Sequence, residues 1–177
     1  MRNIKQKPNL GNKILIIGCA GSGKTTLARQ LNTLTGLPII HLDNYYWTEN
    51  WCRKSDDEWN DIIQDLSKQP KWIMDGNYTK TMSTRIQYAT SIIYLDVPRW
   101  KCLSRVFIRR FRLFYNKKRN DIPANCNERI NLEFYRWIWN YPKRSRTQTL
   151  ELLNSNNKNI FHLKSNRDIN TFIKNIR

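Results

Sequence analysis

Short, largely apolar runs recur along the chain, and turn residues follow most of them. Such runs lie at residues 13–17, 37–42, 71–75, 91–96 and 159–163. An unbroken apolar run of about four to eight residues, rich in β-branched side chains, is typical of a strand that is buried on both faces, as in a parallel sheet. The pattern therefore predicts five strands in a mostly parallel sheet.

The segments between these runs carry apolar residues at helical spacing and recognisable caps. Helices are expected at residues 25–34, from the capping box at residues 55–58 to Pro70, at about 99–115, at about 130–139, and after Ser165. Gly36 is placed as the C-cap of the first of these helices. Strands that alternate with helices predict an α/β sandwich.

Four residues end strands or follow them directly: Gly18, Asp43, Asp75 and Asp96. In an α/β sandwich, ligands bind at the carboxyl ends of the strands. We therefore expect these four residues to gather along one edge of the sheet.

Charge is distributed unevenly along the chain. The net charge is +17 over 177 residues, and residues 99–146 alone hold 14 basic and 3 acidic residues. This segment is expected to attract a polyanion such as nucleic acid, an anionic membrane surface or nucleotide phosphates. We treat residues 1–177 as one domain in which residues 99–146 form a basic, lid-like helical segment.

Other compositional signals argue against several classes of protein. Hydrophobic residues make up 40% of the chain and charged residues 25%, as in ordinary globular domains. No apolar run reaches the length of about 18 residues that a membrane-spanning helix needs. The four cysteines never form a CxxC pair, so neither a zinc site nor a disulfide framework is indicated. A cytoplasmic protein without a membrane partner is expected.

The segment from Gly18 to Thr25 matches G-x-x-x-x-G-K-[ST] in full and lies between a strand and a helix. In this motif backbone N–H groups surround a phosphate, the lysine reaches the β- and γ-phosphates, and the hydroxyl binds Mg²⁺. A glycine-rich turn that only caps a helix is the alternative. The expected nucleotide-binding residues of the loop are Gly18, Gly21, Ser22, Gly23, Lys24, Thr25 and Thr26.

The signature motifs of a switch GTPase are absent from the sequence. Asn116-Lys117 is followed by Lys118-Arg119 rather than by x-Asp, and Asp75 leads to Tyr78 rather than to glycine. The chain is also short for a motor core. A small-molecule kinase is the common class that remains.

Three further elements accompany the loop in a fixed order: His-Leu-Asp at 41–43, Trp-Ile-Met-Asp-Gly-Asn-Tyr at 72–78, and Leu-Asp-Val-Pro-Arg at 95–99. Together they resemble the bacterial DNA topology modulation (FlaR-like) proteins, an adenylate-kinase-like branch of P-loop ATPases. The similarity runs from about residue 13 to the C-terminus. It implies an ATP-binding, kinase-like three-layer fold with strand order 2-3-1-4-5, and it leaves the substrate open.

The basic helix also resembles the start of an adenylate kinase lid. By that similarity Arg105 lies against the adenine ring, and Arg109 or Arg110 contacts phosphates. A solvated basic face is the alternative. Spacing predicts a core stripe on the same helix, made of Leu103, Phe107, Phe111 and Phe114.

Several residues near the expected edge have two interpretations each. Asp75 is a candidate Mg²⁺ ligand through a water, beside Thr25, or a cap of the turn at Gly76. Asp43 is a candidate acceptor of the substrate's proton, or it forms an Asx-turn. Tyr78 is a candidate substrate contact.

Other residues of this region also have candidate roles. Arg85 is a candidate for the acceptor's anionic group or an ordinary surface arginine. Asp96 is expected to fix a turn without a catalytic role. The aromatic residues either stack on a substrate or pack internally, and they are Tyr45, Tyr46, Trp47 and Trp51. The two histidines, His41 and His162, are expected only to pack.

These observations favour an ATP- and Mg²⁺-dependent phosphotransferase in which Lys24, Asp43 and Arg109 are catalytic and the acceptor is a small molecule or nucleotide. One alternative is a nucleic-acid-binding regulator that binds ATP and uses Trp137, Trp139 and Tyr141. A simple NTPase with water as acceptor is another. Any nucleic acid binding by the kinase is expected to be weak and non-specific. The oligomeric state stays open.

Overall fold

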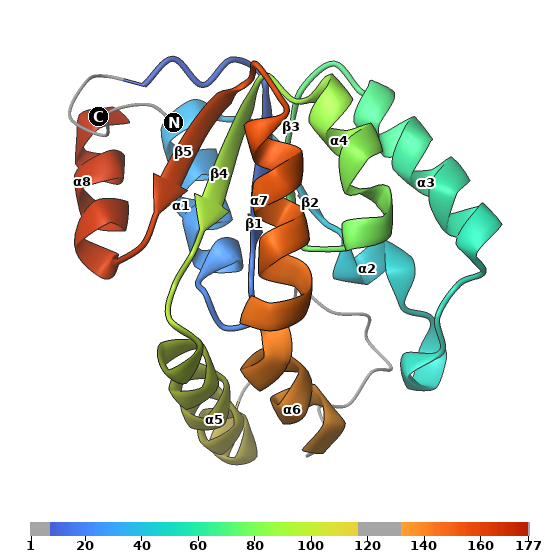
Figure 1. Ribbon diagram of the computed structural model, residues 1–177, viewed down its shortest axis with the longest axis vertical. Coiled ribbons are helices and arrows are strands. Elements are labelled where there is room, and N and C mark those ends of the chain that lie inside the picture. The colour runs from blue at the N-terminus through green and yellow to red at the C-terminus, as the bar shows by residue number, and fades with distance from the viewer. Residues whose placement is uncertain (1–7, 117–131, 177) are drawn as a thin grey trace.

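A five-stranded, all-parallel sheet forms the centre of the computed structural model, which describes residues 8–116 and 132–176 (Figure 1). The strands are β1 (Lys13–Gly18), β2 (Ile39–His41), β3 (Trp72–Asp75), β4 (Ser91–Leu95) and β5 (Asn159–Leu163). Their order in the sheet is β2-β3-β1-β4-β5, and every neighbouring pair is parallel. The predicted α/β class and strand order are confirmed.

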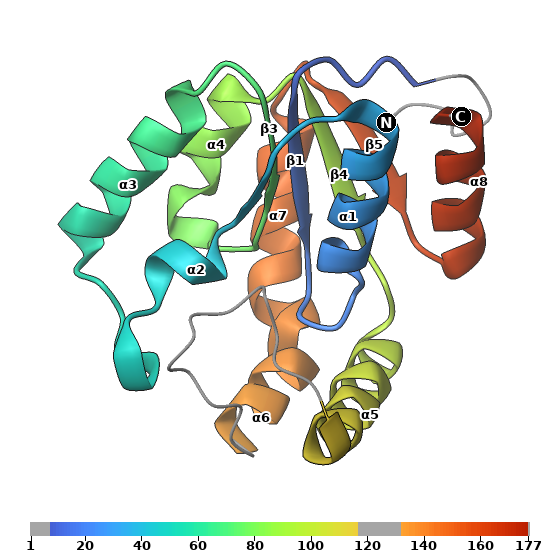
Figure 2. The same cartoon turned by 180° about the vertical axis from the view of Figure 1, so that it is seen from behind.

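Helices cover both faces of this sheet. They are α1 (Lys24–Thr35), α2 (Asp43–Tyr46), α3 (Asp56–Lys68), α4 (Met82–Tyr88), α5 (Arg99–Asn116), α6 (Leu132–Tyr141), α7 (Thr147–Asn154) and α8 (Asn166–Ile176). Short helical segments are η1 (Glu49–Trp51), η2 (Thr79–Thr81) and the π-helical η3 (Pro142–Arg146). Helices α1 and α8 lie on one face, and α3, α4 and α7 lie on the other (Figures 1 and 2).

Alternate residues of β1 enter the two layers of the core. Ile14 and Ile16 pack with α1 and α8, whereas Leu15 and Ile17 pack with α3 and α4. All four side chains are fully buried. Burial on both faces explains why the strand is apolar throughout rather than alternating.

Three of the predicted caps are present. Ser55 Oγ accepts a hydrogen bond from the Glu58 backbone N–H at 3.2 Å, and Gly36 ends α1 with φ of 70°. Ser165 Oγ likewise accepts from the Asp168 backbone N–H at the start of α8. Each cap provides a partner for a backbone group that the helix itself leaves unpaired.

The second strand is shorter than its apolar run suggests, and Asp43 begins a helix rather than ending a strand. The carbonyl of Leu42 accepts from the N–H groups of Tyr45 and Tyr46, so the chain coils directly after His41. Asp43 is consequently the first residue of α2.

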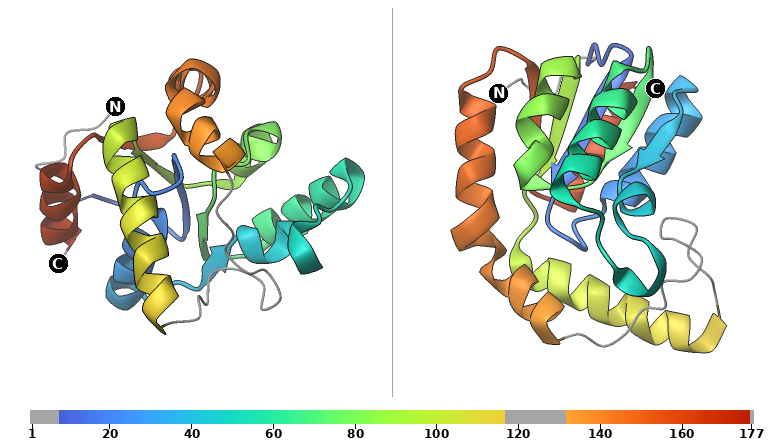
Figure 3. Two further views of the ribbon diagram at one scale, coloured as in Figure 1. Left: turned by 90° about the horizontal axis from the view of Figure 1, so that it is seen from below. Right: turned by 90° about the vertical axis from the view of Figure 1, so that its right-hand side faces the viewer.

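Helix α5 lies across the carboxyl edge of the sheet, and α6 packs against it (Figure 3). Among the described side chains of α5, Cys102 and Val106 are buried, while Phe107 is 54% exposed. Leu103 packs against the core as predicted, but the assignment of Phe107 to the same stripe is wrong, because α5 packs on the loop after β1 rather than flat on the sheet. The side chains of residues 111–116 and all of residues 117–131 lie outside the described part, including the rest of that stripe.

Among residues 8–116 and 132–176, no helix is both long enough and apolar enough to cross a bilayer.

Candidate functional site

The loop from Gly18 to Thr25 connects β1 to α1 at the carboxyl edge of the sheet. Gly21 and Gly23 have φ of 78° and 103°, a region that side chains rarely adopt. A Cβ on Gly21 would lie 2.4 Å from the carbonyl oxygen of Cys102 in α5. The loop therefore requires glycine at position 21, both for its backbone conformation and for the approach of α5.

Lys24 lies within this loop. Its Nζ donates to the carbonyls of Gly18 and Cys19 at 3.0 Å each. The first turn of α1 provides unpaired N–H groups beside this ammonium, and the positive end of a helix attracts anions. The arrangement is suited to binding phosphate.

Two further loop residues differ in exposure. Ser22 is fully buried, and its backbone N–H donates to the Cys19 carbonyl at 3.1 Å, so Ser22 supports the loop from within. Thr26 is exposed in the first turn of α1.

Asp75 connects the loop to β2. The Thr25 hydroxyl donates to Asp75 Oδ2 at 3.0 Å, and His41 Nδ1 lies 2.8 Å from Asp75 Oδ1. Because a carboxylate only accepts, Nδ1 carries the proton and donates. The N–H of Gly76 bonds to the carbonyl of Ile16 instead, so the turn-capping interpretation of Asp75 is wrong.

The interpretation of His41 as a packing residue is also incomplete, since it binds this carboxylate. No local signal indicated the contact, because the two residues are 34 positions apart and meet through the register of β2 with β3.

Asp43 and Tyr78 form a second pair at this edge. The Tyr78 hydroxyl donates to Asp43 Oδ1 at 2.6 Å. Burial and the negative charge of Asp43 raise the pKa of Tyr78 far above its usual value, so its hydroxyl keeps its proton. The structure thus brings two predicted substrate residues into contact.

Aromatic packing fixes this pair. The ring of Tyr78 lies 4.6 Å from that of Tyr46 and 4.9 Å from that of Trp59. Trp47 makes an edge contact with Tyr46, and Trp51 in turn contacts Trp47. Internal packing therefore accounts for Tyr46, while Tyr45 is 40% exposed and its stacking role stays a prediction.

Arg85 has no exposed surface, so its interpretation as an ordinary surface arginine is wrong. Its guanidinium donates to the backbone carbonyls of Gly76, Tyr78 and Thr81. Burial lowers the pKa of Arg85 to about 9. In this arrangement Arg85 holds the loop that carries Tyr78 and does not face an acceptor.

Asn77 lies between the loop and α6. Its Oδ1 accepts from the Gly18 N–H at 3.3 Å and from the Tyr141 hydroxyl at 3.4 Å. Tyr141 is 5% exposed, so it is a packing residue rather than a stacking platform.

Asp96 is the centre of a polar cluster at the ends of β4 and β5. Arg146 donates to both of its oxygens at 2.8 Å, and His162 Nε2 lies 2.8 Å from Oδ2. Burial alone would raise the pKa of Asp96, but the hydrogen bonds from His162 and Arg146 outweigh it and hold the pKa well below its usual range. Asp96 thus fixes η3 to the sheet, and His162 does more than pack.

Arg105 of α5 lies over the loop, and its predicted contact with the adenine ring stays a prediction. It donates to the carbonyls of Ser22 at 3.1 Å and Gly21 at 3.4 Å, and to Asn166 Oδ1 of α8. Arg109 and Arg110 are half-buried further along the same helix.

The oxygen atoms of Thr25 and Asp75 are a donor set that suits Mg²⁺. No group of three or more His, Cys, Asp or Glu residues in the described chain could hold a metal ion by itself. Mg²⁺ is usually held by one or two protein groups together with phosphate and water.

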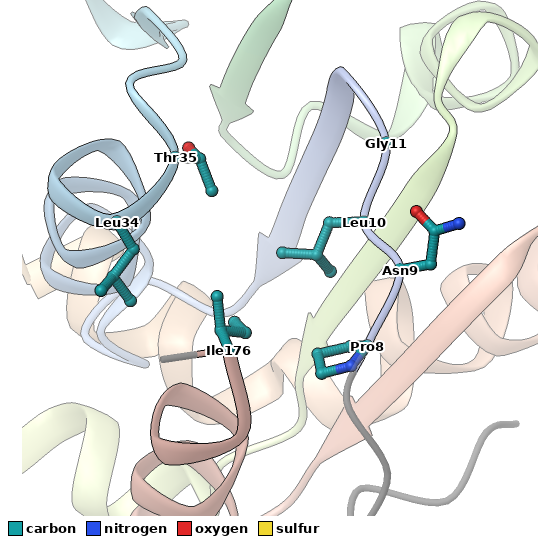
Figure 4. A pocket seen from close by; sticks show the side chains of 7 residues that line it. All are labelled: Pro8, Asn9, Leu10, Gly11, Leu34, Thr35 and Ile176. Carbon is teal, nitrogen blue, oxygen red and sulfur yellow. The ribbon is translucent and has the colours of Figure 1, made fainter.

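A separate open depression of about 600 Å³ lies at the opposite end of β1 (Figure 4). Its lining contains no charged side chain and includes Leu10, Leu34 and Ile176. Nothing there provides chemistry, so the carboxyl edge remains the candidate site.

Comparison with known proteins agrees with this geometry. A family model described as "ATPase family associated with various cellular activities (AAA)" matches residues 14–96, which include the loop and Asp75. "Uncharacterized protein YqaC" from Bacillus subtilis (strain 168) is 31% identical over 108 residues. That match spans 59% of this chain and 60% of the relative's length.

Similar solved structures include several kinases. A shikimate kinase from Acinetobacter baumannii has a TM-score of 0.63 at 15% identity and covers 93% of this chain and 90% of its own. A gluconokinase from Sinorhizobium meliloti 1021 has a TM-score of 0.54 at 11% identity, with coverage of 96% and 91%. A deoxyadenosine kinase from M. mycoides has a TM-score of 0.52 at 16% identity, with coverage of 91% and 94%.

At these identities the likeness concerns the fold alone. The sheet order, the loop and these neighbours together define the class: the chain has a P-loop NTPase fold with kinase-like structural neighbours.

Proposed function

We propose that the protein is an ATP- and Mg²⁺-dependent phosphotransferase that acts on a hydroxyl group of a small molecule or nucleotide. The observation that carries this proposal is that two carboxylates at one sheet edge have different hydrogen-bond partners. The hydroxyl of Thr25 in the loop donates to Asp75, whereas the hydroxyl of Tyr78 donates to Asp43.

The loop residues bind and orient ATP in this proposal. Lys24 leaves the carbonyls of Gly18 and Cys19 and donates to the β- and γ-phosphates. Thr25 and Asp75 hold Mg²⁺, Asp75 through a water. When bound, the ion neutralises charge on the transferring phosphoryl group.

Asp43 would accept the proton of the acceptor hydroxyl, and Tyr78 would orient that carboxylate and contact the substrate. Arg105 would lie against the nucleotide, and Arg109 or Arg110 would contact its phosphates. Transfer then depends on positioning and on charge neutralisation by Lys24 and Arg109. The setting we propose for this activity is the cytoplasm.

A nucleic-acid-binding regulator, as in the FlaR-like proteins that the sequence resembles, is the second candidate. Trp137 and Trp139 of α6 are 39% and 49% exposed, and the guanidinium of Arg99 lies 4.0 Å from the centre of the Trp139 ring. Exposed rings beside arginines suit base stacking. A simple NTPase, with water as acceptor, is the third candidate.

The test is the initial rate of ADP formation from MgATP with and without panels of nucleosides, nucleotides and sugars. At least one acceptor should raise the rate well above the background without acceptor. Asp43→Asn should remove that increase and leave the background rate unchanged, because the substitution keeps the size of the side chain and deletes only the base. A background rate that no acceptor raises would favour the NTPase.

A further inference from the structure

Three elements of the fold meet at the carboxyl group of Asp75. Thr25 lies in the first turn of α1, Asp75 ends β3, and His41 ends β2 directly opposite Asp75 in the strand register. The hydroxyl of Thr25 binds one carboxylate oxygen and the imidazole of His41 binds the other. Each oxygen therefore has its own protein partner.

Neither a lysine nor an arginine of the described residues neutralises the charge of Asp75. Asp75 is 5% exposed, and no lysine or arginine among the described residues forms a salt bridge with it. A carboxylate buried in this way is unfavourable unless a cation or several hydrogen bonds compensate it. Its Oδ2 faces the loop, where the proposed function needs an oxygen for a metal-bound water.

We infer that His41 is a positioning residue for the metal site, and this inference rests on the proposed function. A carboxyl group can rotate about the bond to its Cβ, which would exchange its two oxygens. The Nδ1–H of His41, mounted on a strand paired with β3, fixes Oδ1 and so directs Oδ2 toward Thr25 and the ion. Groups that orient a metal-binding carboxylate in this way typically change metal affinity by about 10–100-fold when they are removed.

Two variants separate orientation from packing. His41→Asn keeps a donor near the position of Nδ1, whereas His41→Leu keeps similar bulk without a donor. Each is compared with wild type by titrating a fluorescent ATP analogue with Mg²⁺ present and with EDTA. The ratio of the two dissociation constants measures how much the ion contributes to nucleotide binding, and no acceptor or turnover is needed.

We expect His41→Leu to lose about tenfold or more of this Mg²⁺ enhancement and His41→Asn to retain most of it. Binding in EDTA should be alike in all three proteins, whereas the metal-free melting temperature of His41→Leu should fall, because the buried carboxylate loses a hydrogen bond. An unchanged enhancement in His41→Leu would overturn the role of His41 and leave the proposed function standing. Equal losses in both variants would overturn it too, since the donor would then not matter. A wild-type protein without any Mg²⁺ enhancement would instead contradict the proposed function itself.

Discussion

Arg85 shows how one buried side chain determines the shape of the site. Its guanidinium pairs with three backbone carbonyls between Gly76 and Thr81, and the structure gives it no exposed surface. The charge is costly to bury, but the planar donors of arginine satisfy carbonyls that would otherwise be unpaired. The loop with Tyr78 depends on this one residue.

We predict that Arg85→Lys lowers the free energy of unfolding by about 2 kcal/mol or more. A lysine presents one ammonium in place of the arginine fork, so at least one buried carbonyl loses its partner, at about 1–3 kcal/mol. Chemical denaturation measures the change. Lys80→Ala is the matched control, because Lys80 pairs with Asp56 on the surface and its loss should have little effect. Equal stability of Arg85→Lys and wild type would contradict the structural role of Arg85.

Asp96 makes a pH-dependent contribution to stability. The pKa of its carboxyl is lower in the folded protein than the ordinary value of 3.8, so the unfolded chain binds protons more readily in acid. The contribution is present above pH 4 and is lost as the pH falls through the folded-state pKa. Its partners are Arg146 and His162.

Asp96→Asn should therefore destabilise the protein at pH 7 and make stability depend less on pH between about 5 and 3. Urea unfolding at several pH values measures both effects. Parallel pH profiles for the variant and wild type would show that Asp96 contributes nothing to acid unfolding. The Asp56→Asn variant serves for comparison, because the pKa of Asp56 is also lowered, chiefly by a hydrogen bond from Lys80, but at an exposed site.

Among the secondary-structure elements, helix α5 packs directly against the phosphate loop. Cys102 packs on Gly21, and Arg105 donates to the loop's carbonyls. These contacts explain why the helix buries Cys102 and Val106 and leaves Phe107 exposed. Spacing alone could not show this, because it does not reveal which part of the fold the helix packs against.

Arg105→Ala should weaken ATP binding about tenfold or more, because a charge-assisted hydrogen bond is worth about 1.5–3 kcal/mol. Lys101→Ala removes the same charge from the same helix, where the ammonium lies over Trp100, and should leave ATP affinity nearly unchanged. Calorimetric titration of both variants tests this. Equal, small losses would assign Arg105 to general electrostatic attraction rather than to a nucleotide contact.

Element prediction succeeded where local signals decide the structure. The strands β1, β3 and β4 were found because both of their faces are buried, and the caps at Ser55 and Gly36 follow from backbone geometry. The side-chain pairs of the site were largely missed. His41 and Asp75 are 34 residues apart, and the register of β2 with β3 brings them together. Arg146 and Asp96 are 50 residues apart, and they meet because η3 packs next to the end of β4.

Across the whole molecule, the chemistry is concentrated at the carboxyl edge. The loop follows β1, Asp75 ends β3, and Asp43 and Asp96 come just after β2 and β4. Helices α5 and α6 lie beyond this edge (Figures 1 and 3). The described basic residues of α5, α6 and η3 thus lie on the same side as the phosphate loop, where they can attract a nucleotide. The fold class, the strand order and the gathering at one edge were all predictable; the acceptor was not.

The destination of the γ-phosphoryl group tests the central claim most directly. ATP labelled at the γ-phosphate is incubated with the protein, Mg²⁺ and a metabolite extract, and the labelled products are separated. We predict label on an organic acceptor in wild type and none with Lys24→Ala. That variant loses the ammonium group of the loop, while its hydrophobic core is unchanged. Label that appears only as inorganic phosphate, or equally with Lys24→Ala, would contradict a phosphotransferase that uses this loop.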